Sequence, residues 1–134
     1  MTGTKTILSR ILFLFYLALV ALILFMRPDR LPDLQKEIFG FPADKAAHFL
    51  MFLPFPVLSF MAFVPPAKTA WKVILHSFAV LLAGAALAAM TEYVQGLLPY
   101  RVKDFSDFRA DILAIGISAL LVFTVDIFNY RKRA

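Results

Sequence analysis

The chain has 134 residues, of which 61% are hydrophobic and only 17% are charged, and its mean hydropathy is +0.79. This composition excludes an ordinary soluble domain and indicates a small integral membrane protein, and the absence of Cys excludes disulfides, thiolate metal sites and cysteine nucleophiles. The net charge of +5 comes from basic residues scattered among short segments, so we expect anionic lipid headgroups rather than nucleic acid as the partner.

The first predicted span covers residues 7–26. Residues 11–26 carry only aromatic and aliphatic side chains, and residues 7–10 extend this run to the roughly 20 residues that cross a bilayer. A signal peptide is the alternative, but no small-x-small cleavage site follows Met26 and the run exceeds a typical h-region. We therefore expect a membrane helix.

Residues 33–41 are the candidate for extra structure between the first two spans. Leu34, Ile38 and Phe41 fall on one side of a short helix in this stretch. Such a helix is expected to lie at the membrane interface.

The second and third predicted spans cover residues 46–64 and 73–91. Pro54 and Pro56 lie inside the second span and predict a kink in it. The third span carries small residues four apart, which allow close contact with another helix. These are Ala79, Ala83, Gly84, Ala85, Ala86, Ala88 and Ala89.

The fourth predicted span covers residues 108–128 and is free of charged side chains from 112 to 125. Asp126 near its end is interpreted as a helix-end charge paired with the basic tail that follows. The four spans predict an all-α fold, an integral membrane four-helix bundle that forms one domain over residues 1–134.

Four spans place both termini on the same side of the membrane. Each side receives seven Lys and Arg residues, so the positive-inside rule does not decide the orientation. The side of the termini carries one carboxylate, Asp126, and the other side carries eight. On this asymmetry we expect both termini in the cytoplasm, with the protein in a bacterial cytoplasmic membrane.

Polar side chains gather at the ends of the apolar spans, and this topology brings them to one membrane face. They number nine: Asp44, Lys45, His48, Glu92, Gln95, Arg101, Asp104, Asp107 and Asp111. Spacings of three and four residues align the members of each segment on one side of a helix. We therefore predict that these nine residues form a ligand-binding site.

The nine residues stand in three ordered motifs: Asp44-Lys45-x-x-His48-Phe49, then Glu92-x-x-Gln95, then Arg101 with Asp104 and Asp107 followed by Ala110-Asp111-x-x-Ala114-x-Gly116. This order resembles the VanZ-like family, multi-pass membrane proteins named for a teicoplanin-resistance protein. The resemblance covers about residues 40–120 and implies a protein of the bacterial envelope, with an association with glycopeptide resistance. The family usually has Asn in place of Asp111 and often Gly in place of Ala114.

Three residues of the motifs allow both a chemical and a structural interpretation. His48 is interpreted as a proton carrier, metal ligand or phosphate contact, and Glu92 as a general base or metal ligand. Glu92 needs a partner near the membrane boundary, and Lys45, Arg101 and His48 are the candidates. Arg101 is the candidate clamp for a phosphate or carboxylate. The structural alternatives are an interfacial helix start, an ion pair that locks two helices, and a headgroup anchor.

Three functions follow as hypotheses. The first is binding of an anionic lipid-linked envelope intermediate, such as a polyprenyl phosphate, by Lys45 and Arg101. The second is a lipid-headgroup hydrolase or transferase, in which Glu92 or His48 is the catalytic base and a divalent cation lies on the aspartates. The third is a proton-coupled transporter or flippase subunit. His76 is interpreted as an interface residue on the opposite face, outside the site.

Overall fold

The computed structural model describes residues 3–27, 37–38, 40–101 and 103–133. It contains α1 (Gly3–Phe25), β1 (Glu37–Ile38), β2 (Phe41–Pro42), α2 (Ala43–Phe52), α3 (Phe55–Phe63), α4 (Ala70–Gln95) and α5 (Phe105–Arg131). Four helical segments are long and apolar enough to cross a membrane: α1, α2 with α3, α4, and α5. The predicted all-α, four-helix membrane bundle is confirmed, and the chain is a multi-pass membrane protein.

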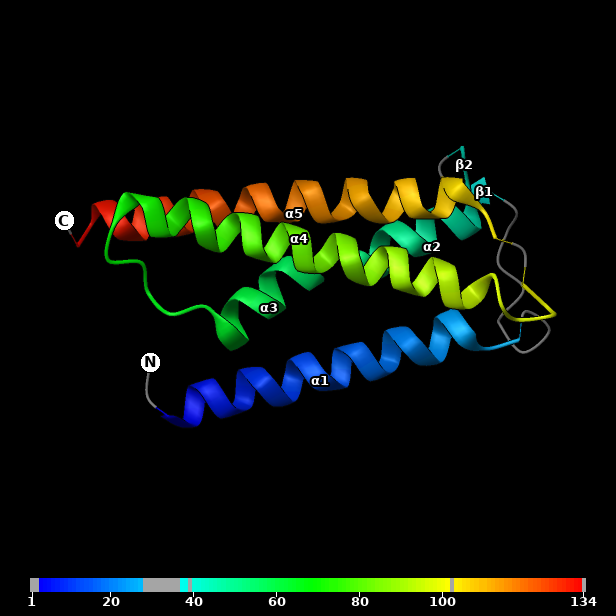
Figure 1. The fold of residues 1–134 in the computed structure, drawn as a ribbon, viewed down its shortest axis with the longest axis horizontal. Helices are drawn as coiled ribbons and strands as arrows, with labels where there is room; N and C mark the ends of the chain where they lie inside the picture. The colour runs from blue at the N-terminus through cyan, green and yellow to red at the C-terminus, as the bar shows by residue number, and fades with distance from the viewer. Residues whose placement is uncertain (1–2, 28–36, 39, 102, 134) are drawn as a thin grey trace.

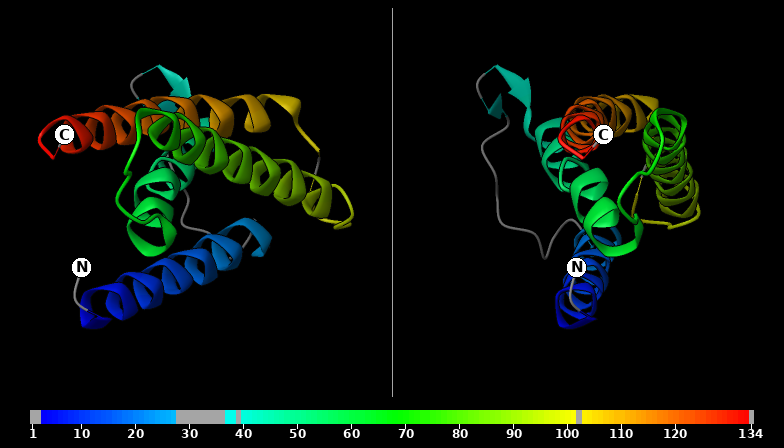
Figure 2. Two further views of the ribbon diagram at one scale, coloured as in Figure 1. Left: turned by 60° about the vertical axis from the view of Figure 1, so that its left-hand side comes forward. Right: turned by 90° about the vertical axis from the view of Figure 1, so that its left-hand side faces the viewer.

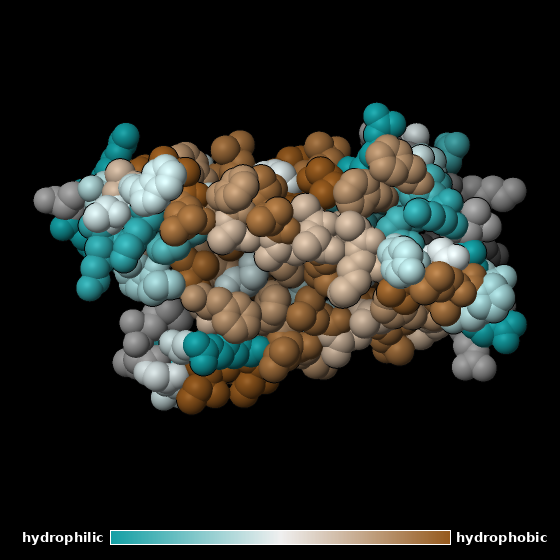
Figure 3. Space-filling view, viewed as in Figure 1, coloured by the Kyte–Doolittle hydropathy of each residue, from teal (hydrophilic) through white to brown (hydrophobic). Residues whose placement is uncertain are grey.

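The long helices α1, α4 and α5 run roughly along the long axis of the molecule, whereas α3 runs obliquely to them (Figure 1 and Figure 2). Figure 1 shows α4 and α5 side by side and antiparallel, with the chain termini at one end and the β1–β2 pair at the other. Figure 2 shows α3 between α1 and the α4–α5 pair. In Figure 3 a hydrophobic belt separates two hydrophilic ends, as expected of side chains that face lipid tails between two aqueous boundaries.

The second span is broken at its first internal proline. α2 ends at Phe52 and α3 begins at Phe55, with Pro54 as the residue that precedes α3. Pro54 and Pro56 have no N–H, so neither can donate to the carbonyl four residues earlier. The expected kink is confirmed, and it divides this span into two helices.

The helix expected over residues 33–41 is wrong where the structure describes this segment. Glu37 pairs with Pro42 and Ile38 with Phe41 in a two-residue antiparallel ladder, and Gly40 has a φ of 79°. Glycine adopts this left-handed conformation without a Cβ clash, so the chain reverses here instead of continuing as a helix. Residues 33–36 and 39, Leu34 among them, lie outside the described residues.

The bundle core forms where small residues let the helices approach. A Cβ added to Gly84 in α4 would lie 2.9 Å from Cγ2 of Ile115 in α5 and 3.1 Å from the ring of Phe55 in α3. Ala88 and Ala114 are fully buried in the same contact. The small residues of the third span therefore provide the close packing predicted for them.

Candidate functional site

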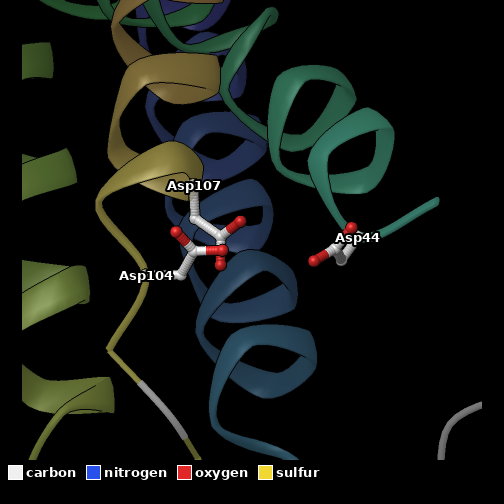
Figure 4. Close-up of side chains that lie close together, drawn as sticks. All are labelled: Asp44, Asp104 and Asp107. Atoms are coloured by element: carbon white, nitrogen blue, oxygen red, sulfur yellow. The ribbon is translucent and has the colours of Figure 1, made fainter. Parts of the chain in front are cut away.

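A polar cluster lies at the end of the bundle opposite the chain termini. It contains Asp44, Lys45 and His48 from α2, Glu92 from the last turn of α4, Asp104 at the N-cap of α5, and Asp107 and Asp111 from the first two turns of α5. Figure 4 shows Asp44 facing Asp104 and Asp107 from the neighbouring helix. Six of these seven residues lie in helices, and Asp104 is the N-cap of α5. His48 and Asp111 fall inside the predicted spans, whereas Asp44, Lys45, Glu92 and Asp107 are helical because the helices extend past those spans.

The Lys45 ammonium is the centre of the cluster. Its Nζ donates hydrogen bonds to Asp104 Oδ2 at 2.5 Å, to Asp107 Oδ1 at 2.7 Å and to Asp44 Oδ2 at 3.0 Å. All three ammonium hydrogens are thus directed at carboxylates from two helices. Lys45 and Asp107 are largely buried, with 23% and 14% of the side chain exposed, whereas Asp44 is 60% exposed.

His48 lies one turn deeper than Lys45 and is held by a fully buried carboxylate. Its Nδ1 lies 3.1 Å from Oδ1 of Asp111, and its Nε2 lies 3.7 Å from Oδ2 of Asp107. Asp111 has no exposed surface, and its Oδ2 has no hydrogen-bond partner. A carboxylate that orients one imidazole nitrogen leaves the other free to exchange a proton, so this arrangement allows acid–base chemistry at Nε2.

Glu92 has a different partner from those expected. Its Oε1 accepts a hydrogen bond of 2.8 Å from the backbone N–H of Asp104, at the start of α5. The side chains of Lys45, Arg101 and His48, which were the candidates for this role, do not form the hydrogen bonds of Glu92 in the described structure. The N-terminal end of a helix carries partial positive charge, which favours a carboxylate at this position.

Two of the nine predicted residues point away from the cluster, toward the end of α1. Gln95 Nε2 donates to the carbonyl of Leu24 at 2.9 Å, and an Nη atom of Arg101 donates to the carbonyl of Met26 at 2.9 Å. Carbonyls in the last turn of a helix lack intrahelical partners, and cations are favoured there. The amide and the guanidinium therefore dock α1, and the cluster proper contains seven of the nine predicted residues.

The spacing analysis did not single out Tyr100, which also contacts the end of α1. Its hydroxyl donates to the carbonyl of Phe25 at 3.1 Å. No local pattern signals this contact because the two residues are 75 positions apart. The nearest sign in the sequence is its place beside Arg101 in the short turn that follows α4.

Charge in the cluster is predominantly negative, since five carboxylates accompany one lysine and one histidine. The hydrogen bond from Lys45, followed by that from the backbone N–H of Ser106, lowers the pKa of Asp104 from 3.8 to about 2. Asp104 is therefore ionised at every physiological pH. Lys45 is correspondingly held by a permanent negative charge on α5.

Three carboxylates of the cluster have the geometry to hold a cation. One oxygen from each of Asp44, Asp104 and Asp107 lies within 4.8 Å of the others. The Lys45 ammonium contacts all three and neutralises them in part. Oxygen ligands of this kind suit Mg²⁺ or Ca²⁺.

His76 and Asp126 form a second polar contact at the opposite end of the bundle. His76 Nδ1 lies 3.3 Å from Asp126 Oδ2, and Asp126 is only 2% exposed. The interpretation of Asp126 as a helix-end charge paired with the basic tail is therefore wrong. Asp126 points into the contact between α4 and α5, where burial favours a partner from the neighbouring helix over a solvated tail.

Comparison with the models of known protein families, with curated proteins and with solved structures found no match for this chain. The resemblance to VanZ-like proteins stays a prediction from the motifs. Function is therefore inferred from the site itself.

Proposed function

We propose that this multi-pass membrane protein binds the phosphate-bearing headgroup of a lipid-linked envelope intermediate at the polar cluster. The observation that carries the proposal is the Lys45 ammonium, which joins α2 to the start of α5 through three hydrogen bonds to carboxylates. A lysine at headgroup depth is a strong contact for phosphate.

Exchange of one carboxylate for a phosphate oxygen requires little rearrangement. Asp44 is the most exposed of the three carboxylates that Lys45 contacts, and exposed ion pairs are weak. A phosphate that approaches Lys45 from the exposed side of Asp44 can take the place of that carboxylate while Asp104 and Asp107 keep the ammonium in position. The negative charge of the cluster then selects headgroups that bring a neutralising cation or donor groups with them, such as a divalent cation or sugar hydroxyls.

Exposed apolar side chains on α2 and α5 offer a surface for the lipid tail. Leu50 on α2 and Leu113 on α5 are about 60% exposed, and they follow Lys45 and Asp107 toward the middle of the bundle. Side chains of this type are compatible with hydrocarbon and unfavourable in water. A ligand with a charged head and a long apolar tail matches both parts.

Membership of the VanZ-like family, and a role in glycopeptide susceptibility, belong to the same proposal. They are supported by the contacts between residues of different motifs: Lys45 with Asp104 and Asp107, and His48 with Asp111. Residues of separate motifs are expected to contact one another if the motifs of the family together form one site. The carboxylate of Asp111 takes part in this contact where the family usually has an amide.

Native mass spectrometry of the protein released gently from its own membranes tests the proposal. The wild type is compared with Lys45→Met and with Lys103→Met, which removes an equal charge from an exposed side chain outside the cluster. We expect a phosphorylated polyprenyl lipid on the wild type and on Lys103→Met, and its loss from Lys45→Met. Ordinary phospholipids bound equally by all three proteins would contradict the proposal.

A second candidate function is a metal-assisted hydrolase or transferase of lipid headgroups. It is favoured by the orientation of His48, whose Nδ1 is held by Asp111 and whose Nε2 faces Asp107. In this function His48 or Glu92 is the base, and Asp44, Asp104 and Asp107 hold a divalent cation. Release of product by the wild type, with turnover lost and binding retained in Glu92→Gln, would favour this candidate over binding alone.

We place both termini in the cytoplasm and the polar cluster at the outer face of the bacterial cytoplasmic membrane. The proposal rests on the distribution of side-chain carboxylates, since the side of the termini has one, Asp126, which is buried, and the other side has eight. The chain has no Cys, so Lys103→Cys and Lys132→Cys give single labelling sites. We expect a membrane-impermeant maleimide added outside to label position 103 only. Labelling of position 132 alone would contradict this orientation and place the termini outside.

A further inference from the structure

A cavity of about 530 Å³ lies at the end of the bundle that carries the chain termini, far from the polar cluster. It is lined by Pro65, Pro66, Ala67, Lys68, Tyr130 and Arg133. These residues belong to the connection between α3 and α4 and to the C-terminal end of α5. Its volume is in the range of small-ligand sites.

Prolines, a helix cap and a turn fix the backbone on both sides of this cavity. Pro65 and Pro66 restrict the connection, Ala67 is buried, and the Thr69 side chain accepts a hydrogen bond from the N–H of Lys72 to start α4. On the other wall, the N–H of Arg133 donates to the carbonyl of Tyr130 at 2.9 Å, which continues α5 as a turn. Contacts of the chain itself therefore hold both walls of the cavity.

Both charged side chains that line the cavity are basic in the part of the chain that the structure describes. Lys68 and Arg133 line it, and within the described residues neither side chain forms an ion pair. Asp126, the one acidic side chain that the sequence places on this side, is buried and lies 3.3 Å from His76. The surrounding face carries further Lys and Arg residues and appears as a hydrophilic patch at the end of the hydrophobic belt (Figure 3).

We propose that this cavity binds the phosphate of an anionic membrane lipid in the leaflet on the side of the termini. The Arg133 guanidinium and the Lys68 ammonium supply the charge, and the Tyr130 hydroxyl supplies a further donor. The lining residues directly follow α3 and form the C-terminal end of α5, so the cavity lies at the end of membrane-spanning helices, where lipid headgroups are found. The proposal concerns the opposite face from the polar cluster and does not depend on its function.

Trp71 provides a natural probe, since it is the only tryptophan in the chain, lies in the first turn of α4 and is 68% exposed. The full-length protein is placed in phosphatidylcholine vesicles that contain phosphatidylglycerol. Two samples are compared, one with brominated phosphatidylcholine and one with brominated phosphatidylglycerol. Bromine quenches the fluorescence of Trp71 only when the brominated lipid lies beside it. The ratio of the two quenching constants gives the preference for the anionic lipid at this position.

The test compares two double variants that remove equal charge from the same end of the bundle. Lys68→Gln/Arg133→Gln alters the cavity, and Lys72→Gln/Arg131→Gln alters exposed residues outside it. We expect the first to lose about thirtyfold in preference for phosphatidylglycerol, equivalent to about 2 kcal/mol at roughly 1 kcal/mol per basic residue, and the second to keep most of it. Lys68→Arg/Arg133→Lys should retain the preference.

An equal loss of preference for phosphatidylglycerol in both double variants would overturn the proposal, because it would show that the lipid responds to the net charge of this end and not to the cavity. An unchanged preference in Lys68→Gln/Arg133→Gln would also overturn it. Inorganic phosphate, added against chloride of the same ionic strength, separates the two sources of phosphate. We expect it to leave the lipid preference unchanged; its displacement of the lipid would assign the cavity to a soluble phosphate compound instead.

Discussion

Replacement of Lys45 by Met is the perturbation that tests the polar cluster most severely. Methionine keeps the unbranched apolar stem of lysine but removes the ammonium, so the carboxylates of Asp44, Asp104 and Asp107 lose their shared donor. The two helices that carry these groups, α2 and α5, then meet with negative charges on both sides. We expect a less stable bundle.

The size of the loss follows from the burial of each contact. The hydrogen bond of 2.7 Å between Lys45 and Asp107 joins side chains that are 23% and 14% exposed, and a charge-assisted bond of this kind contributes about 1.5–3 kcal/mol. The contact with Asp44, which is 60% exposed, adds about 0.5 kcal/mol or less. We therefore expect Lys45→Met to lower the free energy of unfolding by about 1.5–3.5 kcal/mol.

Reversible unfolding in mixed micelles, followed by circular dichroism, measures this loss. Lys103→Met is the matched control, because Lys103 is exposed and forms no ion pair with the described residues. The double variant Lys45→Met/Asp107→Asn should recover more than about 1 kcal/mol, since it removes the unpaired carboxylate as well. A change below about 0.5 kcal/mol in Lys45→Met, equal to that in Lys103→Met, would refute the role of the ammonium in joining α2 to α5.

Three further predictions follow from other contacts. Gly84→Ala places a Cβ 2.9 Å from a neighbouring side chain and should cost about 1–3 kcal/mol of unfolding free energy, whereas Gly116→Ala, with open space around it, should cost nothing. The pKa of Asp104 is about 2 in the folded protein and should return toward 3.8 in Lys45→Met, as measured by carboxyl NMR. Because the pKa is lower in the folded than in the unfolded protein, ionised Asp104 stabilises the fold above about pH 4, and this stabilisation is lost as the pH falls through 2. Arg101→Met leaves carbonyls at the end of α1 without their donor and should lower the unfolding free energy by about 1 kcal/mol, and an unchanged denaturation midpoint would remove this docking role.

The helices were predictable because long apolar runs have few alternatives in a membrane. The residues at which the helices begin and end were harder to predict. The fourth span was expected from residue 108, yet α5 begins at Phe105, where Asp104 accepts a hydrogen bond from the N–H of Ser106 as the N-cap. Hydropathy marks the depth of the bilayer, whereas capping chemistry marks the start of the helix.

The gathering of the polar residues at one end followed from topology alone, but their pairing did not. Whether Lys45 reaches Asp104 and Asp107, and whether Arg101 points to them or away, depends on the rotation of each helix about its axis. That rotation is fixed by contacts between segments far apart in the chain, such as Gly84 against Ile115. Spacing within one segment carries no information on it.

The pairing of His76 with Asp126 had a usable signal in the sequence. Asp126 continues the series Ala114, Ser118 and Val122 at intervals of four residues, and all three are buried. A carboxylate on the packed face of a helix requires a partner from a neighbouring helix. The sequence analysis paired Asp126 with the adjacent basic tail instead, because the tail offers a partner close in the chain.

Binding of a defined polyprenyl phosphate to the protein in nanodiscs is the most direct test of the central claim that the polar cluster recognises a phosphate-bearing headgroup. The dissociation constant is measured for the wild type, Lys45→Met and Lys103→Met, each verified as folded and each with and without a chelator of divalent cations. We expect the wild type and Lys103→Met to bind alike and Lys45→Met to bind at least about tenfold more weakly, the loss of one charge-assisted hydrogen bond. Equal affinity in all three proteins, or no binding by the wild type with or without divalent cations, would contradict the claim.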